Sequence, residues 1–150
     1  MLDQTTSADV SSFFEPAKHL ARERIVRYFA RLALAVAFLS AVADRLGLWG
    51  PYTDGIVVSW GSMARFYQDV AVLSPWAPAW VIPSLSWLIT VLEAGLGLSL
   101  IIGYRLKWTA LLSGLLLLIF ALSMAAFLSV KLMLNYSVLT CAACAFLLFL

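Results

Sequence analysis

Charged residues are scarce in this sequence: Asp, Glu, Lys and Arg account for 12% of its 150 residues. A typical soluble domain has about a quarter of its residues charged, so the sequence does not have the composition of one. Its single histidine, His19, stands among basic residues and far along the chain from the two cysteines, so these residues form no predicted metal site. Basic patches with interleaved aromatic residues are also lacking, and we therefore expect no nucleic-acid partner.

Hydrophobic residues, in contrast, make up 63% of the chain and give it a mean hydropathy of +0.96. They are gathered into long runs, and a helix that spans a membrane needs roughly 20 consecutive apolar residues. Up to four such helices fit, which leaves no length for a soluble catalytic domain. We therefore predict an all-α polytopic membrane protein, a four-transmembrane-helix bundle in contact with the lipid bilayer. The predicted spans are residues 28–48, 82–103, 109–130 and 132–150.

The N-terminal residues 1–14 are polar and mixed in character, and we expect them to be mobile. Glu15 and Pro16 suit a helix start, because proline at the first helical position loses no needed N–H group. No early apolar segment with a small-residue cleavage site is present, so we expect no removable signal peptide. The first span then directs insertion itself, and residues 15–150 are predicted to form one membrane domain.

Between the first two spans, residues 49–81 form a predicted loop rich in tryptophan and proline. Tryptophan and tyrosine gather at membrane–water interfaces. Within the loop, residues 62–72 place Met63, Phe66, Tyr67 and Val70 on one side of a short helix. We predict an extracytoplasmic loop that lies on the membrane surface as a lid and contains this interfacial helix.

The distribution of Lys and Arg predicts the orientation, because cytoplasmic segments carry an excess of these residues. Seven fall on the side of the N-terminus and three on the other side. We therefore expect both termini in the cytoplasm and the tryptophan-rich loop outside. The seven are Lys18, Arg22, Arg24, Arg27, Arg31, Arg105 and Lys107, and the three are Arg45, Arg65 and Lys131.

Glu93 is the most informative polar residue of the predicted spans. It lies about 16 Å along the second span, where a carboxylate is costly and normally faces a bundle interior or a cavity. Ser86, Thr90 and Gly97 share its helix face. Glu93 is therefore protonated, paired with an arginine that reaches it, or bonded to a ligand; a structural acid bonded to Ser, Thr or Tyr is the competing interpretation. The candidate binding residues are Glu93, Thr90, Gly97 and Asp44.

Asp44 lies near the outer end of the first span. It continues a stripe of alanines at residues 33, 37 and 41, so we expect it to face other helices. Arg45 and Lys131 are predicted at a similar level. We therefore predict a structural ion pair among Asp44, Arg45 and Lys131 at the membrane boundary, where water is near and such pairs are common.

The two cysteines, Cys141 and Cys144, have C-x-x-C spacing in the last apolar run, and by residue count Cys144 is level with Glu93. A dithiol with a buried carboxyl group as proton donor would suit a thiol:quinone oxidoreductase, with Glu93, Cys141 and Cys144 as candidate catalytic residues. Alternatively, the cysteines are small residues of a packing stripe with Ser137. Helical geometry favours packing, because Cβ atoms at i and i+3 lie about 5–6 Å apart and a disulfide needs about 3.8 Å.

Four segments resemble the DoxX family of small bacterial and archaeal membrane proteins, in the same order and over residues 27–147. They are RLALAVAFLSAVADRLGLWGP, SWGSMARFYQ, TVLEAGLGLSLIIGYRLKW and LNYSVLT. The most specific part is Glu93 with Gly97, Gly103 and the basic turn before Trp108. The resemblance implies that Glu93 is the family's acidic residue in the second helix. The cysteines depart from the family pattern, in which small Ser and Ala residues are usual.

The resemblance implies a four-helix bundle in a bacterial or archaeal cytoplasmic (inner) membrane, linked to sulfur, thiol or respiratory redox complexes. We expect an accessory, quinone-binding or lipid-binding subunit of such a complex, with quinone as candidate cofactor and other membrane or membrane-associated subunits as partners. A non-catalytic subunit is favoured over a stand-alone enzyme, because no complete catalytic set is present. A thiol:quinone oxidoreductase is one alternative, although residues 49–81 contain no second cysteine pair. A small transporter or proton-conducting unit is the other, disfavoured by the lack of an internal repeat.

Overall fold

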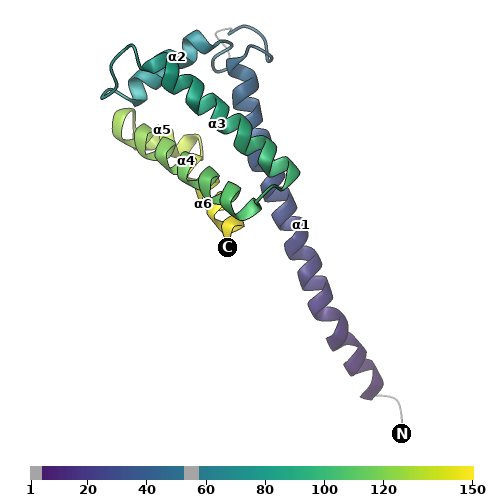
Figure 1. The fold of residues 1–150 in the computed structure, drawn as a ribbon. Coiled ribbons are helices and arrows are strands. Elements are labelled where there is room, and N and C mark those ends of the chain that lie inside the picture. Colours follow the sequence, from purple (N-terminus) through teal and green to yellow (C-terminus); the bar gives the residue numbers. More distant parts are fainter. Residues whose placement is uncertain (1–4, 53–57) are drawn as a thin grey trace.

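The computed structural model describes residues 5–52 and 58–150, and for residues 5–19 and Ala21 the backbone alone. Part of the N-terminus predicted to be mobile, residues 1–4, and part of the predicted loop, residues 53–57, lie outside these ranges. All regular secondary structure within them is helical, as predicted (Figure 1). The helices are α1 (Thr5–Arg45), α2 (Met63–Leu73), α3 (Ile82–Ile102), α4 (Leu106–Phe127), α5 (Val130–Asn135) and α6 (Val138–Phe149).

Helix α1 is longer than predicted and projects away from the other helices at its N-terminal end (Figure 1). It begins at Thr5, so the predicted helix start at Glu15 and Pro16 is wrong. Nothing in the described residues explains the earlier start. Its apolar part, Arg22–Arg45, is long enough to cross a membrane.

Helix α1 ends at Arg45, three residues before the predicted end of the first span at residue 48. A glycine with left-handed backbone conformation follows it. Gly47 has a φ of 76°, and its backbone N–H donates to the carbonyl oxygen of Asp44 at 2.9 Å. The N–H of Leu48 donates to the carbonyl oxygen of Ala43, also at 2.9 Å. Together these bonds form a Schellman motif, which satisfies the last carbonyl groups of the helix. The chain therefore turns sharply directly after Asp44 and Arg45.

Three helices are long and apolar enough to cross a membrane: the Arg22–Arg45 part of α1, α3 and α4. Helix α3 has 21 residues, a length of about 31 Å that matches a hydrocarbon core of about 30 Å. Exposed aromatic residues lie just beyond both of its ends, as is typical at membrane–water interfaces. They are Trp76 and Trp80 before α3, and Tyr104 and Trp108 after it. These are the features of a membrane protein that contacts lipid.

The observed bounds of α2 and α3 agree with the predicted ranges, 62–72 and 82–103, to within one residue at each end. Pro83 stands in the first turn of α3, where its missing N–H group costs no helical hydrogen bond. Helix α4 begins and ends three residues earlier than its predicted span, 109–130.

The predicted uninterrupted fourth span is wrong. Residues 130–149 form two helices, α5 and α6, separated by Tyr136 and Ser137. Ser137 has a φ of 54°, a left-handed conformation that does not continue an α-helix. The polar residues Asn135 and Ser137 favour the break, because such side chains compete with the backbone bonds of a helix. Helix α6 has 12 residues, which cover about 18 Å.

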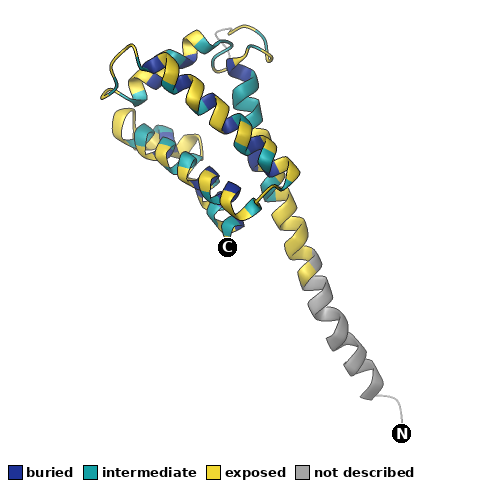
Figure 2. Cartoon of the chain, viewed as in Figure 1, coloured by how far each residue is buried: buried dark blue, intermediate teal, exposed yellow. Residues whose placement is uncertain are grey.

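The most extensive contacts between helices are those of α4 with α6 and of α1 with α3. A Cβ atom on Gly97 of α3 would lie 2.9 Å from Cγ of Leu39 and 3.3 Å from the carbonyl oxygen of Ala35. Glycine at this position therefore lets the backbones of α1 and α3 approach closely. Four helices share one hydrophobic core, formed by Leu34, Ala35, Phe38, Leu100, Ala110, Ala145 and Leu148. These buried positions are dark blue in Figure 2.

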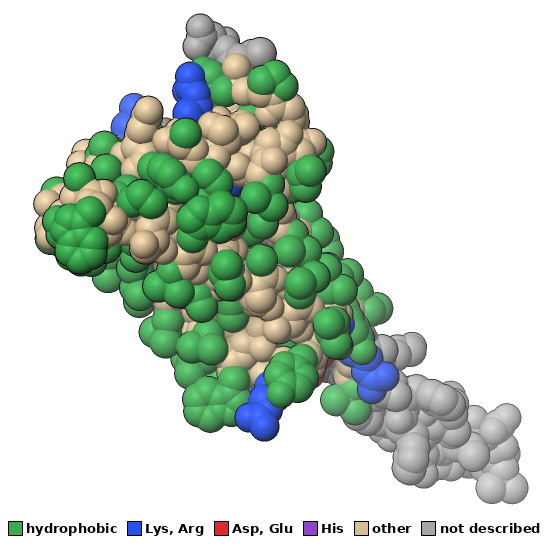
Figure 3. All heavy atoms as spheres, turned by 45° about the horizontal axis from the view of Figure 1, so that its top comes forward, with side chains coloured by type: hydrophobic (Ala, Val, Ile, Leu, Met, Phe, Trp, Pro, Cys, Tyr) green, Lys and Arg blue, Asp and Glu red, His purple; other side chains and the backbone are tan. Residues whose placement is uncertain are grey.

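A second apolar cluster joins α2 to the beginning of α3. Phe66 and Val70 of α2 are buried against Ile82, with Trp60 and Met63 packed around them. Outside both clusters, large apolar side chains cover much of the surface, and Figure 3 shows them over most of the visible face with Lys and Arg toward its edges. This distribution suits a surface in contact with lipid.

Candidate functional site

Glu93 and Arg45 form a buried ion pair between α3 and α1. Nη1 of Arg45 donates to one carboxylate oxygen of Glu93 at 2.5 Å, and Nη2 donates to the other at 3.2 Å. Each side chain is only 3% exposed. Two parallel bonds between a guanidinium and a carboxylate are the strongest arrangement that such a pair can adopt. Of the alternatives considered for Glu93, the structure has an arginine that reaches it.

The geometry of α1 explains how an arginine at its last position contacts the middle of α3. Side chains in an α-helix lean toward its N-terminus, so Arg45 points back along α1. Because α1 and α3 are packed together at Gly97, the guanidinium lies next to α3 and within reach of Glu93. From the sequence we predict Asp44 as the partner of Arg45, because the alignment of α1 with α3 is not contained in any local pattern.

The predicted ion pair of Asp44, Arg45 and Lys131 is therefore wrong. Arg45 has Glu93 as its partner, and among the described residues neither Asp44 nor Lys131 takes part in an ion pair. Lys131 is exposed on α5. The physical reason is that the buried Asp44 carboxylate already accepts backbone N–H bonds from residues 59–61, whereas the guanidinium of Arg45 satisfies the buried Glu93 carboxylate.

The shared polar face of α3 is confirmed, since Ser86, Thr90, Glu93 and Gly97 are all buried. Thr90 joins the ion pair: its hydroxyl oxygen accepts from Nη1 of Arg45 at 3.3 Å and donates to the carbonyl oxygen of Ser86 at 2.8 Å. Gly97 lies one turn further along and contacts Leu39 instead. Of the candidate binding residues, the structure thus brings Glu93 and Thr90 together.

Two aromatic rings cover the guanidinium of Arg45. Its Cζ atom lies 3.7 Å from the ring centroid of Phe66 and 4.8 Å from that of Trp60. The two rings meet edge to face, with centroids 5.2 Å apart. Cations are attracted to aromatic faces, and the attraction is larger where water is excluded. Residues 58–73, called here the α2 segment, therefore close one side of the ion pair.

Asp44 fixes the start of the α2 segment rather than facing other helices. Its carboxylate accepts backbone N–H bonds from Ser59 at 2.9 Å, Gly61 at 2.9 Å and Trp60 at 3.3 Å. Asp44 is buried, whereas the alanines at residues 33 and 37 of the predicted stripe are exposed. The loop covers Asp44, so the prediction that this stripe packs against helices is wrong.

Gly61 and Trp60 are the residues of this site that the sequence analysis missed. Gly61 has a φ of 64°, and a Cβ atom there would lie 2.5 Å from the backbone nitrogen of Tyr52. Nε1 of Trp60 donates to the Asp69 carboxylate at 2.7 Å, which joins the loop to α2. Trp60 and Gly61 stand three and two residues before the first residue of α2. A glycine shortly before a helix could have predicted a turn with a positive φ angle at this position.

These contacts determine what the site can do chemically. Both carboxylate oxygens of Glu93 accept hydrogen bonds from Arg45, so a ligand or proton that binds this carboxylate would compete with the ion pair. Nε of Arg45 is buried without a hydrogen-bond partner. The Arg45–Glu93 pair links α1, α3 and the α2 segment, so its role is to hold these elements together rather than to react.

Cys141 and Cys144 lie one turn apart on α6 and are both free thiols. They are half-buried and pack against the core shared by α1, α3, α4 and α6. Helix α6 is regular through both residues, so the spacing is that of the i and i+3 positions of a helix. The carboxyl group that a thiol reaction would use, Glu93, is paired with Arg45.

Within the described part of the chain, no three His, Cys, Asp or Glu side chains are grouped as metal ligands would be. Comparison with known proteins adds no further guide to function: no protein-family model, curated protein or solved structure matches the chain.

Proposed function

We propose that the chain is a non-catalytic, DoxX-like integral membrane subunit of a redox complex, and that the Arg45–Glu93 pair maintains its shape. The observation that carries the proposal is the buried pair itself. A carboxylate bonded twice to a guanidinium, and covered by Phe66 and Trp60, is suited to hold helices together and poorly suited to exchange protons.

The DoxX resemblance indicates that the complex is a redox complex. The buried Arg45–Glu93 pair indicates that this chain has a structural role in it. A quinone bound at Glu93 would have to displace the guanidinium of Arg45, which would leave two buried charges unpaired. We therefore assign the accessory role to this chain, and the quinone or thiol chemistry to the subunits with which it assembles.

In this proposal the chain crosses a bacterial or archaeal cytoplasmic membrane four times. Helices α1, α3 and α4 supply three crossings, and α5 with α6 supplies a fourth, interrupted one that is packed along α4. The excess of Lys and Arg near the N-terminus and in the turn before α4 supports a cytoplasmic N-terminus. The α2 segment then lies on the extracytoplasmic side. Reporter fusions at the N-terminus and in the loop before α2 test this orientation, and a periplasmic N-terminus would contradict it.

Isolation of the tagged full-length protein from its native membrane tests the proposed role. The expected result is a complex of fixed stoichiometry that contains a redox subunit with its own cofactor. Glu93→Gln should release the chain from this complex, while Lys131→Gln, which removes an exposed charge, should leave the complex intact. Circular dichroism of both variants checks that the helices persist. A chain that purifies alone, or that oxidises its own thiols with a soluble quinone, would contradict the proposal.

A further inference from the structure

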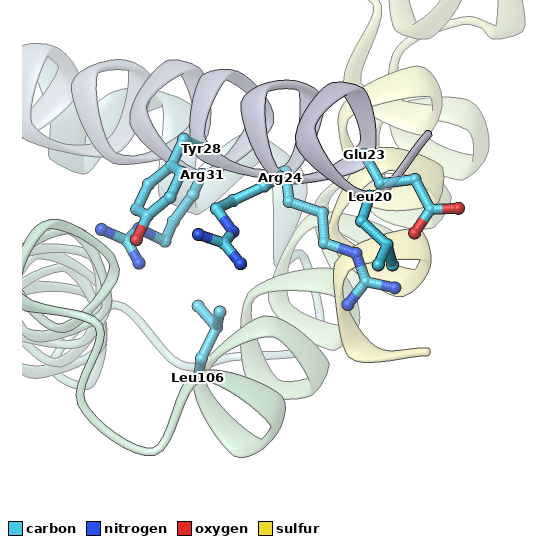
Figure 4. Close-up of a pocket in the computed structure, with 7 residues that line it drawn as sticks. Leu20, Glu23, Arg24, Tyr28, Arg31 and Leu106 are labelled. Carbon is cyan, nitrogen blue, oxygen red and sulfur yellow. The ribbon is translucent and has the colours of Figure 1, made fainter. Parts of the chain in front are cut away.

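A groove opens between the middle of α1, at residues 20–31, and the start of α4, several helical turns along α1 from Arg45. It has a volume of about 380 Å³. Figure 4 shows Leu106 of α4 pointing toward side chains of α1 across the groove. The α1 residues that line it are Leu20, Glu23, Arg24, Arg27, Tyr28 and Arg31.

Three arginines give the groove a positive lining. Arg24, Arg27 and Arg31 are spaced i, i+3 and i+7, so they follow one face of α1. In Figure 4 the carboxylate of Glu23 points away from Tyr28 and Arg31. The excess of guanidinium groups makes the groove complementary to an anion that carries several acceptor oxygens.

Arg31 is held at the inner end of the groove. Its Nη2 donates to the carbonyl oxygen of Ile101 at 3.4 Å, and its Cζ lies 4.8 Å from the ring centroid of Tyr28. Its Nε is buried and has no hydrogen-bond partner. A cation whose position is already fixed by a neighbouring helix end and an aromatic ring binds an anion at little entropic cost.

The position of the groove indicates which anion. It lies where two apolar helices begin, the Arg22–Arg45 part of α1 and Leu106–Phe127 of α4. Leu20 and Leu106 line it, and the exposed apolar side chain of Leu32 lies one turn along α1 from Tyr28 of the lining. Basic pockets between membrane helices at this level bind the headgroups of anionic lipids. We infer that the groove binds the phosphate of one anionic phospholipid, whose acyl chains lie along α1.

This inference goes beyond the proposed function and is independent of it. The matched variants are Arg24→Gln with Arg27→Gln inside the groove, and Arg22→Gln with Lys107→Gln outside its lining. Both pairs remove two positive charges from the same end of the molecule. Arg31 is left in place, because it also contacts α3.

The experiment measures lipid binding to the full-length protein in neutral detergent by native mass spectrometry, with phosphatidylglycerol and phosphatidylcholine as probes. The wild type should retain one phosphatidylglycerol and bind it more tightly than phosphatidylcholine. Each arginine near a phosphate contributes a factor of about five, so removal of two in the groove variant should weaken binding roughly twenty-five-fold. The control variant should change it less than about threefold, because screened surface charges act weakly at a distance.

Three results would overturn the inference. Equal losses in the two double variants would mean that the positive end of the molecule attracts lipid without a site. Equal affinity for the two phospholipids would mean that the net negative charge of the lipid is not recognised. Displacement of the lipid by inorganic phosphate at similar concentration would mean that the groove binds a free anion. Unchanged thermal unfolding of both variants excludes misfolding as the cause of any loss.

Discussion

Asp44 and Arg45 are neighbours in the sequence, yet their side chains bind different parts of the molecule. The Asp44 carboxylate accepts N–H bonds from the loop before α2, and the Arg45 guanidinium binds Glu93 of α3. Successive residues of an α-helix point about 100° apart, which lets the last turn of α1 contact both at once. Opposite charges at adjacent positions thus organise two separate contacts rather than one ion pair.

Removal of one partner of the buried pair should destabilise the protein strongly. Arg45→Met leaves the Glu93 carboxylate buried without a cation, which should lower the free energy of unfolding by about 3–5 kcal/mol. The double variant Arg45→Met with Glu93→Met leaves no unpaired charge and should recover most of this loss. Unfolding titrations in mixed detergent micelles measure both. The exposed Lys131→Met serves as control, with a change within about 0.5 kcal/mol. Additive losses in the double variant would show that the two residues are not coupled.

Loss of the Asp44 carboxylate should loosen the α2 segment without unfolding the bundle. Asp44→Ala leaves the N–H groups of Ser59 and Gly61 without their acceptor, at a cost of about 1–3 kcal/mol. Hydrogen exchange at these amides should accelerate, while exchange within α3 stays slow. Asp69→Asn, which affects only the exposed bond from Trp60, should have a smaller effect. Uniform acceleration over all helices would contradict a local role for Asp44.

Substitution by alanine should have opposite effects on stability at two glycines of α3. Gly97→Ala places a Cβ atom against Leu39 and Ala35, so we expect α1 and α3 to separate slightly and the unfolding temperature to fall. Gly95 has no atom within 4 Å of such a Cβ atom. Gly95→Ala should therefore stabilise the protein by up to about 1 kcal/mol through helix propensity alone. Thermal unfolding in one detergent compares the two variants. Equal shifts for both would show that close packing at Gly97 is unimportant.

The thiols should remain reduced. A regular helix keeps the Cβ atoms of Cys141 and Cys144 about 5–6 Å apart, which is too far for a disulfide. Protein purified without reductant and then unfolded should react with two equivalents of a thiol reagent, and prior incubation with a soluble quinone should not change this number. Replacement of both cysteines by alanine should alter stability modestly and leave membrane assembly intact. A disulfide formed on addition of quinone would instead support the thiol:quinone oxidoreductase.

The helical parts of the fold were predictable because they follow from local properties. An apolar run was enough to place α3 to within one residue, and the apolar side shared by Met63, Phe66, Tyr67 and Val70 was enough to place α2. The break at Tyr136 and Ser137 was missed because an apolar run of the right length looks continuous when hydropathy alone is counted. The helix start at Thr5 was missed because residues 1–14 are polar and mixed in character and were expected to be mobile.

The candidate site was predictable only in part. The burial of Glu93 and Thr90 followed from their spacing on one helix face, but their partner depends on how α1 and α3 are aligned, which no local pattern contains. Arg45 was therefore assigned to its sequence neighbour. The contacts of Asp44 depend on the conformation of a loop turn at Gly61, and loop conformations are the least accessible to reasoning from helix periodicity.

The Arg45–Glu93 pair also has a consequence for the order in which the chain is assembled. The two residues are 48 positions apart, so Arg45 leaves the ribosome and reaches the membrane before its partner has been synthesised. An arginine without a partner is costly inside a bilayer, so we expect the end of α1 to stay at the lipid–water boundary until α3 has been inserted. Pairing would then fix the two helices at their final relative depth. We therefore expect the first membrane helix to reach its native position only after the second has been made.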